Sequence, residues 1–270
     1  CQTDWAISVA REEFVSRLTK TSSNQEILAV LNETADAVGK VLRANQDWSL
    51  SGLRDTQYAV DLRADAAALE VLTSAGVAVL SEESEITGEF ADDGLCVVMD
   101  PLDGSTNASR GVQWFATALC AIDKDGMRAG LVVNQANGHD RYWATAGGGA
   151  FHNGVAMRPS GCVELREAVV GISGIPKQRP KWGQFRALGA AALDICLVAD
   201  GVIDAWIDFN THGVWDYLAS ALICREAGAF IVEHQDRSLV VHEHGQRRTP
   251  IAAATSELLA SVRQVRAQQS

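Results

Sequence analysis

Apolar residues recur every three or four positions between residues 24 and 42, the spacing of one face of a helix. They are Ile27, Leu28, Leu31, Ala35, Val38 and Leu42. A second helix is predicted over 61–76, ending at Gly76, and the apolar run 77–81 predicts a short buried strand after it. We expect a pair of helices to pack together in this region.

Short apolar runs follow, and they predict a mixed sheet. A strand is expected over 95–100, a hairpin over 115–135 that turns at Asp125 and Gly126, and a strand with a glycine turn over 141–155. After about residue 160, strands and helices alternate. Strands are predicted over 168–173, 202–208, 230–234 and 250–255, and helices over 185–201, over 215–229 and at the end of the chain. The pattern predicts an α/β protein of two halves, 1–160 and 161–270, packed as one compact unit.

Composition narrows the class of protein. The 270 residues are 47% hydrophobic and 21% charged, which is typical of a globular protein. The formal charge of −11 and the lack of clustered Lys and Arg argue against nucleic acid as a partner, because binding to phosphates needs such clusters. The longest apolar stretch, 187–207, is interrupted by aspartates and is unsuited to a membrane. The first residues lack the pattern of a signal peptide, so we expect a cytoplasmic protein.

The cysteines do not form a recognisable site. They are Cys1, Cys96, Cys120, Cys162, Cys196 and Cys224, widely spaced and without a CxxC pair. This spacing favours buried free thiols in a reducing compartment over a disulfide framework or a zinc site.

The stretch "VVMDPLDGSTNAS", residues 97–109, carries the strongest candidate chemistry. Asp100 and Asp103 end an apolar run, and a Gly-Ser-Thr turn follows directly. Two carboxylates this close repel one another and lose hydration unless a cation lies between them. The pair therefore indicates a divalent metal with phosphate nearby, and a solvated turn is the alternative.

Other acidic residues stand at the ends of elements that could converge. Glu82 and Glu83 end a predicted strand, Asp61 heads a helix and Asp216 stands at the start of a late helix. Any one of them alone is typical of a helix cap or a surface position. Together with the aspartate pair they offer the oxygen-rich coordination that Mg²⁺ prefers.

Pro101 gives the aspartate turn a defined geometry. It holds Asp100 extended and helps to aim both carboxylates and the carbonyl of Leu102 to one side. A helix that begins near Ser105 would offer unpaired amides to an anion such as phosphate. The Ser105 hydroxyl could orient a metal-activated water, and Asp61 could accept its proton.

These motifs resemble the inositol monophosphatase family of Mg²⁺-dependent, lithium-sensitive sugar and polyol phosphatases. "DPLDGSTN" is similar to the family signature, and "DTQYAVD", "SEES" and "VWDYLASALICREAGA" resemble three further family elements in the same order and spacing. The resemblance covers most of the chain. Several features depart from the pattern: Ser81 replaces a glycine, Tyr58 replaces a threonine, and Arg54 is the candidate for an upstream basic residue. The spacing from Asp208 to Trp215 is also one residue longer than is usual in the family.

The resemblance implies a role for each candidate residue. Glu82, Asp100 and the Leu102 carbonyl would hold a first Mg²⁺, Asp100, Asp103 and Asp216 a second, and Glu82 would help to hold a weak third. Gly104 and Ser105 would bind the phosphate, and Ser105 with Asp61 and Glu82 would activate water. Asp103, Gly189, Ala190, Ala191, Asp208 and Asp216 would contact the substrate. The implied fold is a layered α-β-α-β-α sandwich, usually a homodimer.

The predicted function is hydrolysis of a small polyol or sugar phosphate monoester similar to inositol 1-phosphate. Histidinol phosphate and a nucleotide 3′-phosphate are alternative substrates, fructose 1,6-bisphosphate is a further one, and a noncatalytic binding protein on this fold is the alternative to an enzyme. A haloacid-dehalogenase phosphatase would need Asp-x-Asp. The spacing from Asp100 to Asp103 is one residue too long for that.

Overall fold

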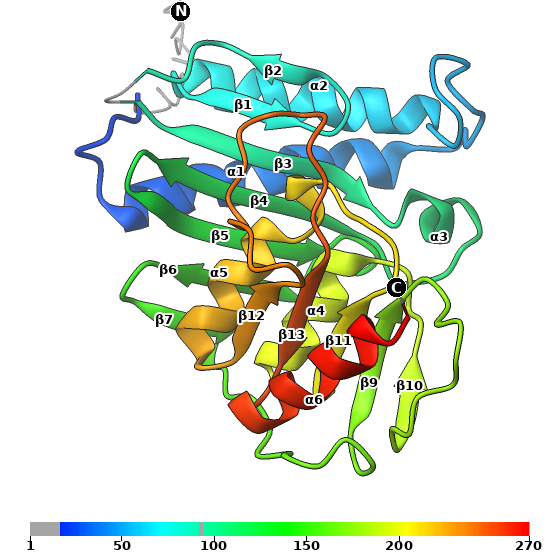
Figure 1. Ribbon diagram of the computed structural model, residues 1–270. Helices are drawn as coiled ribbons and strands as arrows, with labels where there is room; N and C mark the ends of the chain where they lie inside the picture. The colour runs from blue at the N-terminus through cyan, green and yellow to red at the C-terminus, as the bar shows by residue number, and fades with distance from the viewer. Residues whose placement is uncertain (1–16, 92–93, 270) are drawn as a thin grey trace, which may run out of the picture.

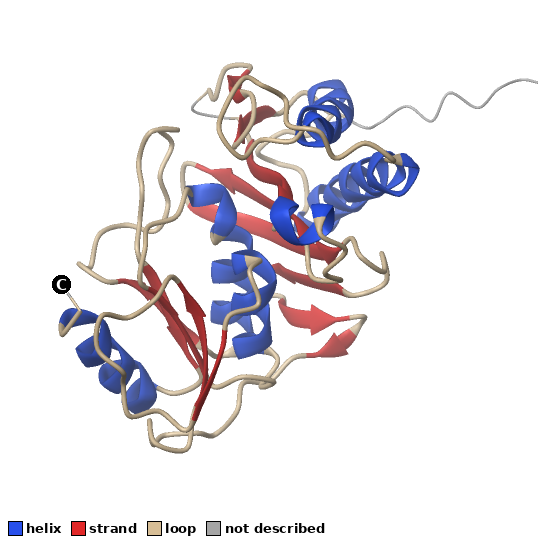
Figure 2. Cartoon of the chain, turned by 90° about the vertical axis from the view of Figure 1, so that its right-hand side faces the viewer, coloured by secondary structure: helices blue, strands red, loops and turns tan. Residues whose placement is uncertain are grey.

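Two β-sheets and three layers of helices alternate through the molecule (Figures 1 and 2). The structure is a computed structural model that describes residues 17–91 and 94–269. Helices α1 (Asn24–Ala44) and α2 (Ala59–Ser74) cover the outer face of the first sheet, α4 (Ala191–Ala199) and α5 (Leu218–Ala227) lie between the sheets, and α6 (Ser256–Ala267) covers the second. The predicted layered α-β-α-β-α sandwich is confirmed.

The first sheet is mixed, as predicted, and has eight strands in the order β2-β1-β3-β4-β5-β6-β7-β8. Its strands are β1 (Ala78–Ser81), β2 (Glu85–Thr87), β3 (Cys96–Asp103), β4 (Ala116–Asp123), β5 (Gly126–Asn134), β6 (Arg141–Thr145), β7 (Gly149–His152) and β8 (Val155–Ala156). Strands β1 and β3 are parallel, and the other neighbours are antiparallel. The predicted hairpin is β4 and β5, in which Asp123 pairs with Gly126.

The second sheet has five strands in the order β10-β9-β11-β13-β12. They are β9 (Val169–Ser173), β10 (Gln184–Arg186), β11 (Ala205–Asp208), β12 (Phe230–Glu233) and β13 (Pro250–Ala253). The change from the first sheet to the second falls between residues 156 and 169. Because α4 and α5 pack against both sheets, the two halves share one interior. The division at residue 160 stays a prediction.

Two of the predicted helices differ from the structure. The helix expected over 185–201 begins only at Ala191, and strand β10 occupies residues 184–186 beside β9. Gly189, with φ of +91°, has a backbone conformation that does not fit a right-handed helix. The helix expected over 215–229 is divided into a short 3-10 turn, η1 (Val214–Asp216), and α5.

The first helix pair forms as the hydrophobic pattern predicts. All six apolar positions predicted on the face of α1 are buried, and α1 packs against α2 and the first sheet. Ser23 and Glu26 form a capping box that satisfies free amides at the start of α1. The start of α2 is held by Asp61, whose carboxylate accepts the Tyr58 amide at 2.8 Å.

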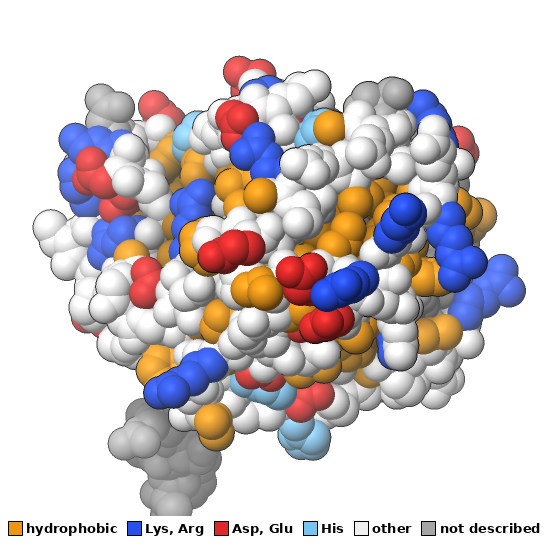
Figure 3. Space-filling view, turned by 60° about the horizontal axis from the view of Figure 1, so that its bottom comes forward, with side chains coloured by type: hydrophobic (Ala, Val, Ile, Leu, Met, Phe, Trp, Pro, Cys, Tyr) orange, Lys and Arg blue, Asp and Glu red, His pale blue; other side chains and the backbone are white. Residues whose placement is uncertain are grey.

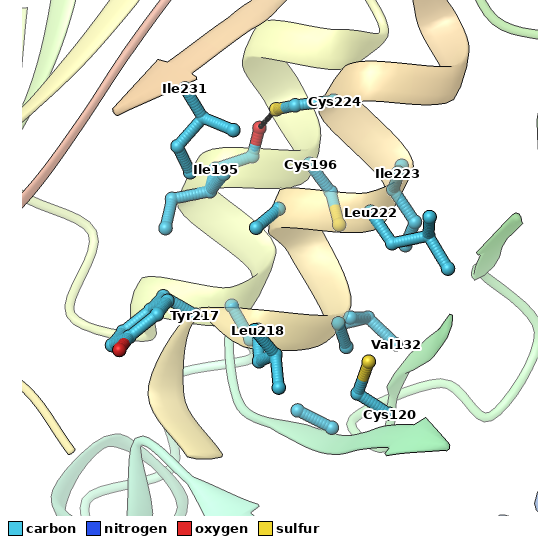
Figure 4. Packing of buried hydrophobic residues seen from close by; sticks show 14 of the residues in the cluster. Cys120, Val132, Ile195, Cys196, Tyr217, Leu218, Leu222, Ile223, Cys224 and Ile231 are labelled. Carbon is cyan, nitrogen blue, oxygen red and sulfur yellow. Dashed lines mark hydrogen bonds between the residues drawn. The ribbon is translucent and has the colours of Figure 1, made fainter. Parts of the chain in front are cut away.

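The interior between the sheets is filled by apolar side chains of α4 and α5 (Figure 4). Cys196 and Cys224 lie there, and the Cys224 thiol donates to the carbonyl of Ile195 at 3.6 Å. Burial raises the pKa of Cys224 to about 12, which keeps it a thiol. The prediction of buried free thiols is confirmed for Cys96, Cys120, Cys196 and Cys224, whereas Cys162 is half-buried and Cys1 lies outside the described residues.

The face toward the viewer in Figure 3 carries acidic and basic side chains, with apolar side chains exposed between them. In the described part of the chain, no helix combines the length and the apolar character needed to cross a membrane.

Candidate metal centre

An irregularity in β3 presents the aspartate pair. Strand β3 pairs with β4 up to Asp100, and after a register shift the pairing resumes at Asp103. Pro101 lies in this shift, where its missing amide costs no ladder hydrogen bond. The amide of Leu102 donates to Asp100 Oδ1 at 2.9 Å, which fixes the Asp100 carboxylate over the turn.

Three carboxylates from distant parts of the chain converge beside this turn. Oxygens of Glu82, Asp100 and Asp216 lie within 4.8 Å of one another. Glu82 follows β1, Asp100 belongs to β3 and Asp216 ends η1 just before α5. The parallel pairing of β1 with β3 places the first two carboxylates at the same end of the sheet.

The charge of this cluster is balanced only in part, by His212 and Arg247 near Asp216. No Lys, Arg or His of residues 17–91 and 94–269 forms an ion pair with the three carboxylates. Burial, and then repulsion by neighbouring carboxylates, raises the pKa of Glu82 and Asp100 well above the ordinary values. Such a set is disfavoured in its charged form unless a cation binds. Hard oxygen ligands of this kind suit Mg²⁺, so the residues fit the metal that the family resemblance implies.

Asp103 lies on the other side of the turn. Its Oδ2 accepts the amide of Ala192 at 2.7 Å in the first turn of α4. Burial, and then the proximity of Asp216, raises its pKa well above the ordinary value. Asp103 and Asp216 line a cavity of about 280 Å³ together with Gly189, Ala190 and Ala191. The structure thus brings the second predicted metal pair next to the residues predicted to contact the substrate.

Gly104 follows Asp103 in a left-handed conformation, with φ of +82°. A Cβ at this position would lie 3.1 Å from the Gly189 carbonyl oxygen and 3.2 Å from that of Trp114. Only glycine therefore fits without a shift of the neighbouring backbone. The five-residue helix α3 (Ser105–Ser109) starts directly afterwards.

Ser105 and Asp61 line a second, smaller cavity of about 90 Å³, together with Glu82 and Leu102. No hydrogen bond joins Ser105 to Asp61 in the described structure. Asp61 is 3% exposed, and its Oδ1 has no hydrogen-bond partner there. Burial raises the pKa of Asp61 to about 7, and the charge of Glu83 acts in the same direction. Asp61 is thus a buried carboxyl that can exchange a proton near neutral pH.

Asp208, a predicted substrate contact, is fully buried behind His212. Its Oδ1 accepts the amide of Asn210 at 2.7 Å, and its Oδ2 is 2.8 Å from His212 Nδ1. The larger cavity is lined by His212 and not by Asp208. Burial opposes protonation of His212, but the hydrogen bond with Asp208 and the nearby carboxylates outweigh it and raise the pKa of His212 to about 9.

Sequence reasoning missed His212 and Asp194. Asp194 lines the larger cavity, accepts Trp114 Nε1 at 2.7 Å and has its pKa raised to about 7 by burial. The only signal for His212 was its place four residues from both Asp208 and Asp216. Asp194 had no signal, because an isolated aspartate in an apolar helix pattern does not show what it faces.

The three residues that depart from the family pattern each have a local hydrogen-bond partner. Arg54 donates to the carbonyls of Glu82 and Glu83 at 3.1 and 2.9 Å and forms an ion pair with the Glu83 carboxylate. The Ser81 hydroxyl donates to Asp65 and accepts the Glu83 amide at 3.1 Å. The Tyr58 hydroxyl accepts that of Ser109 at 2.8 Å, linking the start of α2 to α3.

The fold and the converging carboxylates define an α/β sandwich protein with an acidic centre at the ends of β1 and β3. Comparison with known proteins identifies the family within that class. The chain belongs to the inositol monophosphatase family, whose model matches residues 23–269.

Relatives and solved structures agree with this assignment. A fructose-1,6-bisphosphatase/inositol-1-monophosphatase of Archaeoglobus fulgidus is 33% identical over 208 residues, covering 74% of this chain and 79% of the relative. An inositol-1-monophosphatase of Mesorhizobium japonicum is 33% identical over 69% of this chain and 75% of the relative. The crystal structure of the extragenic suppressor protein suhB from Bartonella henselae matches with a TM-score of 0.74 and 26% identity, covering 89% of this chain and 98% of that one.

Proposed function

We propose that this protein is a Mg²⁺-dependent phosphatase that hydrolyses a small polyol or sugar phosphate monoester. The observation that carries the proposal is the convergence of Glu82, Asp100 and Asp216 within 4.8 Å, where none of the three forms an ion pair with a described side chain. The 33% identity to two proteins named as phosphatases supports the reaction class. A noncatalytic binding protein would have no need to keep this converging set of carboxylates.

The metal ligands are proposed as two overlapping sets. Glu82, Asp100 and the Leu102 carbonyl would hold one Mg²⁺; Asp100, Asp103 and Asp216 would hold a second, and Glu82 would help to hold a weaker third. When bound, Mg²⁺ would neutralise the charge on the phosphate and make water a stronger nucleophile. Li⁺ is expected to inhibit by competing at the second set.

The smaller cavity supplies the groups that handle the phosphate and the water. Gly104 and Ser105 are proposed to bind the phosphate, because the backbone turns there without a Cβ in the way. The Ser105 hydroxyl would orient the attacking water. Asp61, with its free Oδ1, would accept the proton, and Glu82 lines the same space.

The larger cavity is the proposed site of the alcohol portion. The small side chains of Ala190 and Ala191, and Gly189 beside them, leave room for it next to Asp103 and Asp216. A volume of about 280 Å³ suits a small polyol. We propose that Asp208 acts on the alcohol through His212, because the histidine and not the aspartate lines the cavity.

Several finer points also belong to this proposal. Inositol 1-phosphate represents the substrate class that we favour, and histidinol phosphate and nucleotide 3′-phosphates are alternatives. Fructose 1,6-bisphosphate is a further candidate because one relative is named for that activity. We also propose a cytoplasmic homodimer with no nucleic-acid or membrane partner, on the basis of the −11 charge, the composition and the family resemblance.

A phosphate-release screen tests the proposal. The purified protein is assayed with inositol 1-phosphate, sugar phosphates, histidinol phosphate, nucleotide 3′-phosphates and fructose 1,6-bisphosphate, with Mg²⁺ or with a chelator. We expect release from a small polyol or sugar monophosphate that needs Mg²⁺. Full turnover after exhaustive chelation would contradict the metal mechanism. Absence of phosphate release from every substrate would contradict the proposal that the protein is a phosphatase.

A further inference from the structure

A long connection between two strands of the second sheet extends to the proposed metal centre. Residues 234–249, here called the strap, connect β12 to β13. In Figure 1 the strap extends from the second sheet across the first sheet toward β1. The ring of His242 packs on Phe90, with centroids 5.5 Å apart. The strap therefore contacts both halves of the chain.

The strap touches the metal centre through His244. Its Nε2 lies 3.0 Å from the carbonyl oxygen of Glu82, so Nε2 carries the proton and donates. Arg54 Nη1 donates to the same carbonyl oxygen at 3.1 Å. The carbonyl of this proposed metal ligand is therefore held by two donors, one before it in the chain and one 162 residues after it.

The backbone is what positions the Glu82 side chain. Within the described residues no hydrogen bond or ion pair is made by the Glu82 carboxylate, whereas its amide donates to the carbonyl of Met99 at 3.1 Å. By contrast, Asp100 accepts the Leu102 amide and Asp216 accepts the Gly213 amide. Glu82 depends on contacts to its main chain more than the other two carboxylates do.

His244 also contacts the element that carries Asp216. Its ring stacks on Trp215, with centroids 4.6 Å apart and planes 27° apart. The guanidinium of Arg247, also in the strap, lies 5.0 Å from the Trp215 ring. Trp215 directly precedes Asp216 in η1. One histidine thus contacts the Glu82 side and the Asp216 side of the cluster.

We propose that His244 and Arg54 are positioning residues that clamp the Glu82 carbonyl and so set the affinity of the centre for Mg²⁺. The inference rests on the proposed metal site but assigns a role to residues outside its ligand set. The clamp fixes the origin of the Glu82 side chain and so its distance from the other two carboxylates. Loss of either donor lets Glu82 move away from the other carboxylates, which weakens metal binding.

Calorimetric titration of the purified, substrate-free protein with Mg²⁺ tests the clamp. His244→Phe keeps an aromatic ring on Trp215 but removes the donor, and it is expected to weaken Mg²⁺ binding about three- to tenfold, the effect of one net hydrogen bond. His244→Gln can still donate to the carbonyl and should stay within about twofold of the wild type. His242→Phe makes the same replacement two residues away on the strap, and it should bind Mg²⁺ as the wild type does.

The outcomes separate this inference from the proposed function. Absence of Mg²⁺ binding by the wild type would contradict the proposed metal site itself. Wild-type affinity in His244→Phe, or equal weakening in His244→Gln and His244→Phe, would overturn the clamp. If His244→Phe does not fold by circular dichroism, Arg54→Met tests the same carbonyl from a side chain that is 45% exposed. It should weaken binding by a similar factor, and unchanged binding would overturn the clamp.

Discussion

The carboxylate of Asp208 holds the ring of His212 through Nδ1, at 2.8 Å, so that Nε2 lies 3.5 Å from the hydroxyl of Ser173, which lines the larger cavity with His212. In many proteins a buried acid binds one ring nitrogen of a histidine and so orients the other nitrogen toward a ligand. With the alcohol portion of the substrate in the larger cavity, as proposed, His212 would be one of the groups that it meets.

His212→Asn separates this role from a structural one. Asparagine can still reach Asp208 but has no atom at the position of Nε2, so a polyol phosphate would lose one hydrogen bond. We expect KM for that substrate to rise about three- to tenfold. For p-nitrophenyl phosphate, which has no hydroxyl groups, KM should be unchanged. Steady-state kinetics on both substrates checks this.

His212→Gln, which can place a polar atom near the Nε2 position, should restore part of the affinity for the polyol phosphate. The exposed His139→Asn serves as the matched control and should behave as the wild type. Equal losses on the two substrates would show that His212 only maintains the cavity wall.

Asp61 should make the metal-free protein less stable as the pH rises. Its pKa is about 7 in the folded chain, against about 4 in an unfolded one. Between these values the folded state keeps a proton that the unfolded state has released. The stabilisation that this proton on Asp61 gives to the folded state is therefore fully present below about pH 4 and lost as the pH approaches 7. Asp61→Asn does not ionise, so we expect it to raise the melting temperature more at pH 8 than at pH 5.

Thermal unfolding in excess chelator at the two pH values measures this difference. Asp55→Asn replaces an exposed aspartate nearby and should show no such difference between pH 5 and pH 8. The activity of Asp61→Asn should nevertheless fall, because the proposed proton acceptor is lost. An equal stability change at both pH values would contradict a raised pKa for Asp61.

Mg²⁺ should stabilise the fold, and by more at pH 8 than at pH 5. Burial and mutual repulsion raise the pKa values of Glu82, Asp100 and Asp103, so protons compete with the metal as the pH falls. At high pH the metal-free cluster carries negative charge that the bound cation relieves. Differential scanning calorimetry with and without Mg²⁺ gives the shift at each pH. An equal shift in an Asp100→Asn variant would place the stabilising ion elsewhere.

Much of the fold could be predicted because its elements follow local rules. The apolar spacing of α1 and the short buried run of β1 come from the period of each element alone. Strand β10 was missed because all three of its residues are exposed and it pairs only with β9. The start of α4 was placed too early because a run of alanine and leucine matches a helix even where Gly189 turns the chain.

The acidic centre was predictable because its carboxylates stand at the ends of elements. Asp100 was visible at the end of an apolar run, and Glu82 at the end of another. The surroundings were not predictable, since they depend on contacts between distant segments. Nothing in "HEHGQRR" indicates that His244 reaches Glu82, and the sequence around Asp208 does not show that His212 lies between it and the cavity.

The last prediction separates the proposed metal ligands from the groups that would act on water. Asp216→Asn keeps the size of the side chain but removes charge from the proposed second metal set, so Mg²⁺ affinity should fall and high Mg²⁺ should recover part of the rate. Ser105→Ala leaves every carboxylate in place. It removes the hydroxyl proposed to orient the water, so kcat should fall by roughly 10²–10⁴ with little change in the Mg²⁺ requirement.

Rates measured across a Mg²⁺ titration distinguish the two defects, because a metal-affinity defect shifts the titration curve and a water-activation defect lowers its plateau. The curve for Asp216→Asn should shift to higher Mg²⁺, whereas that for Ser105→Ala should keep its midpoint at a lower plateau. If Ser105→Ala has a wild-type plateau while Asp216→Asn is inactive at every Mg²⁺ concentration, Ser105 is only a turn residue. Activation of water would then fall to Asp61 or Glu82, the other acids that line the smaller cavity.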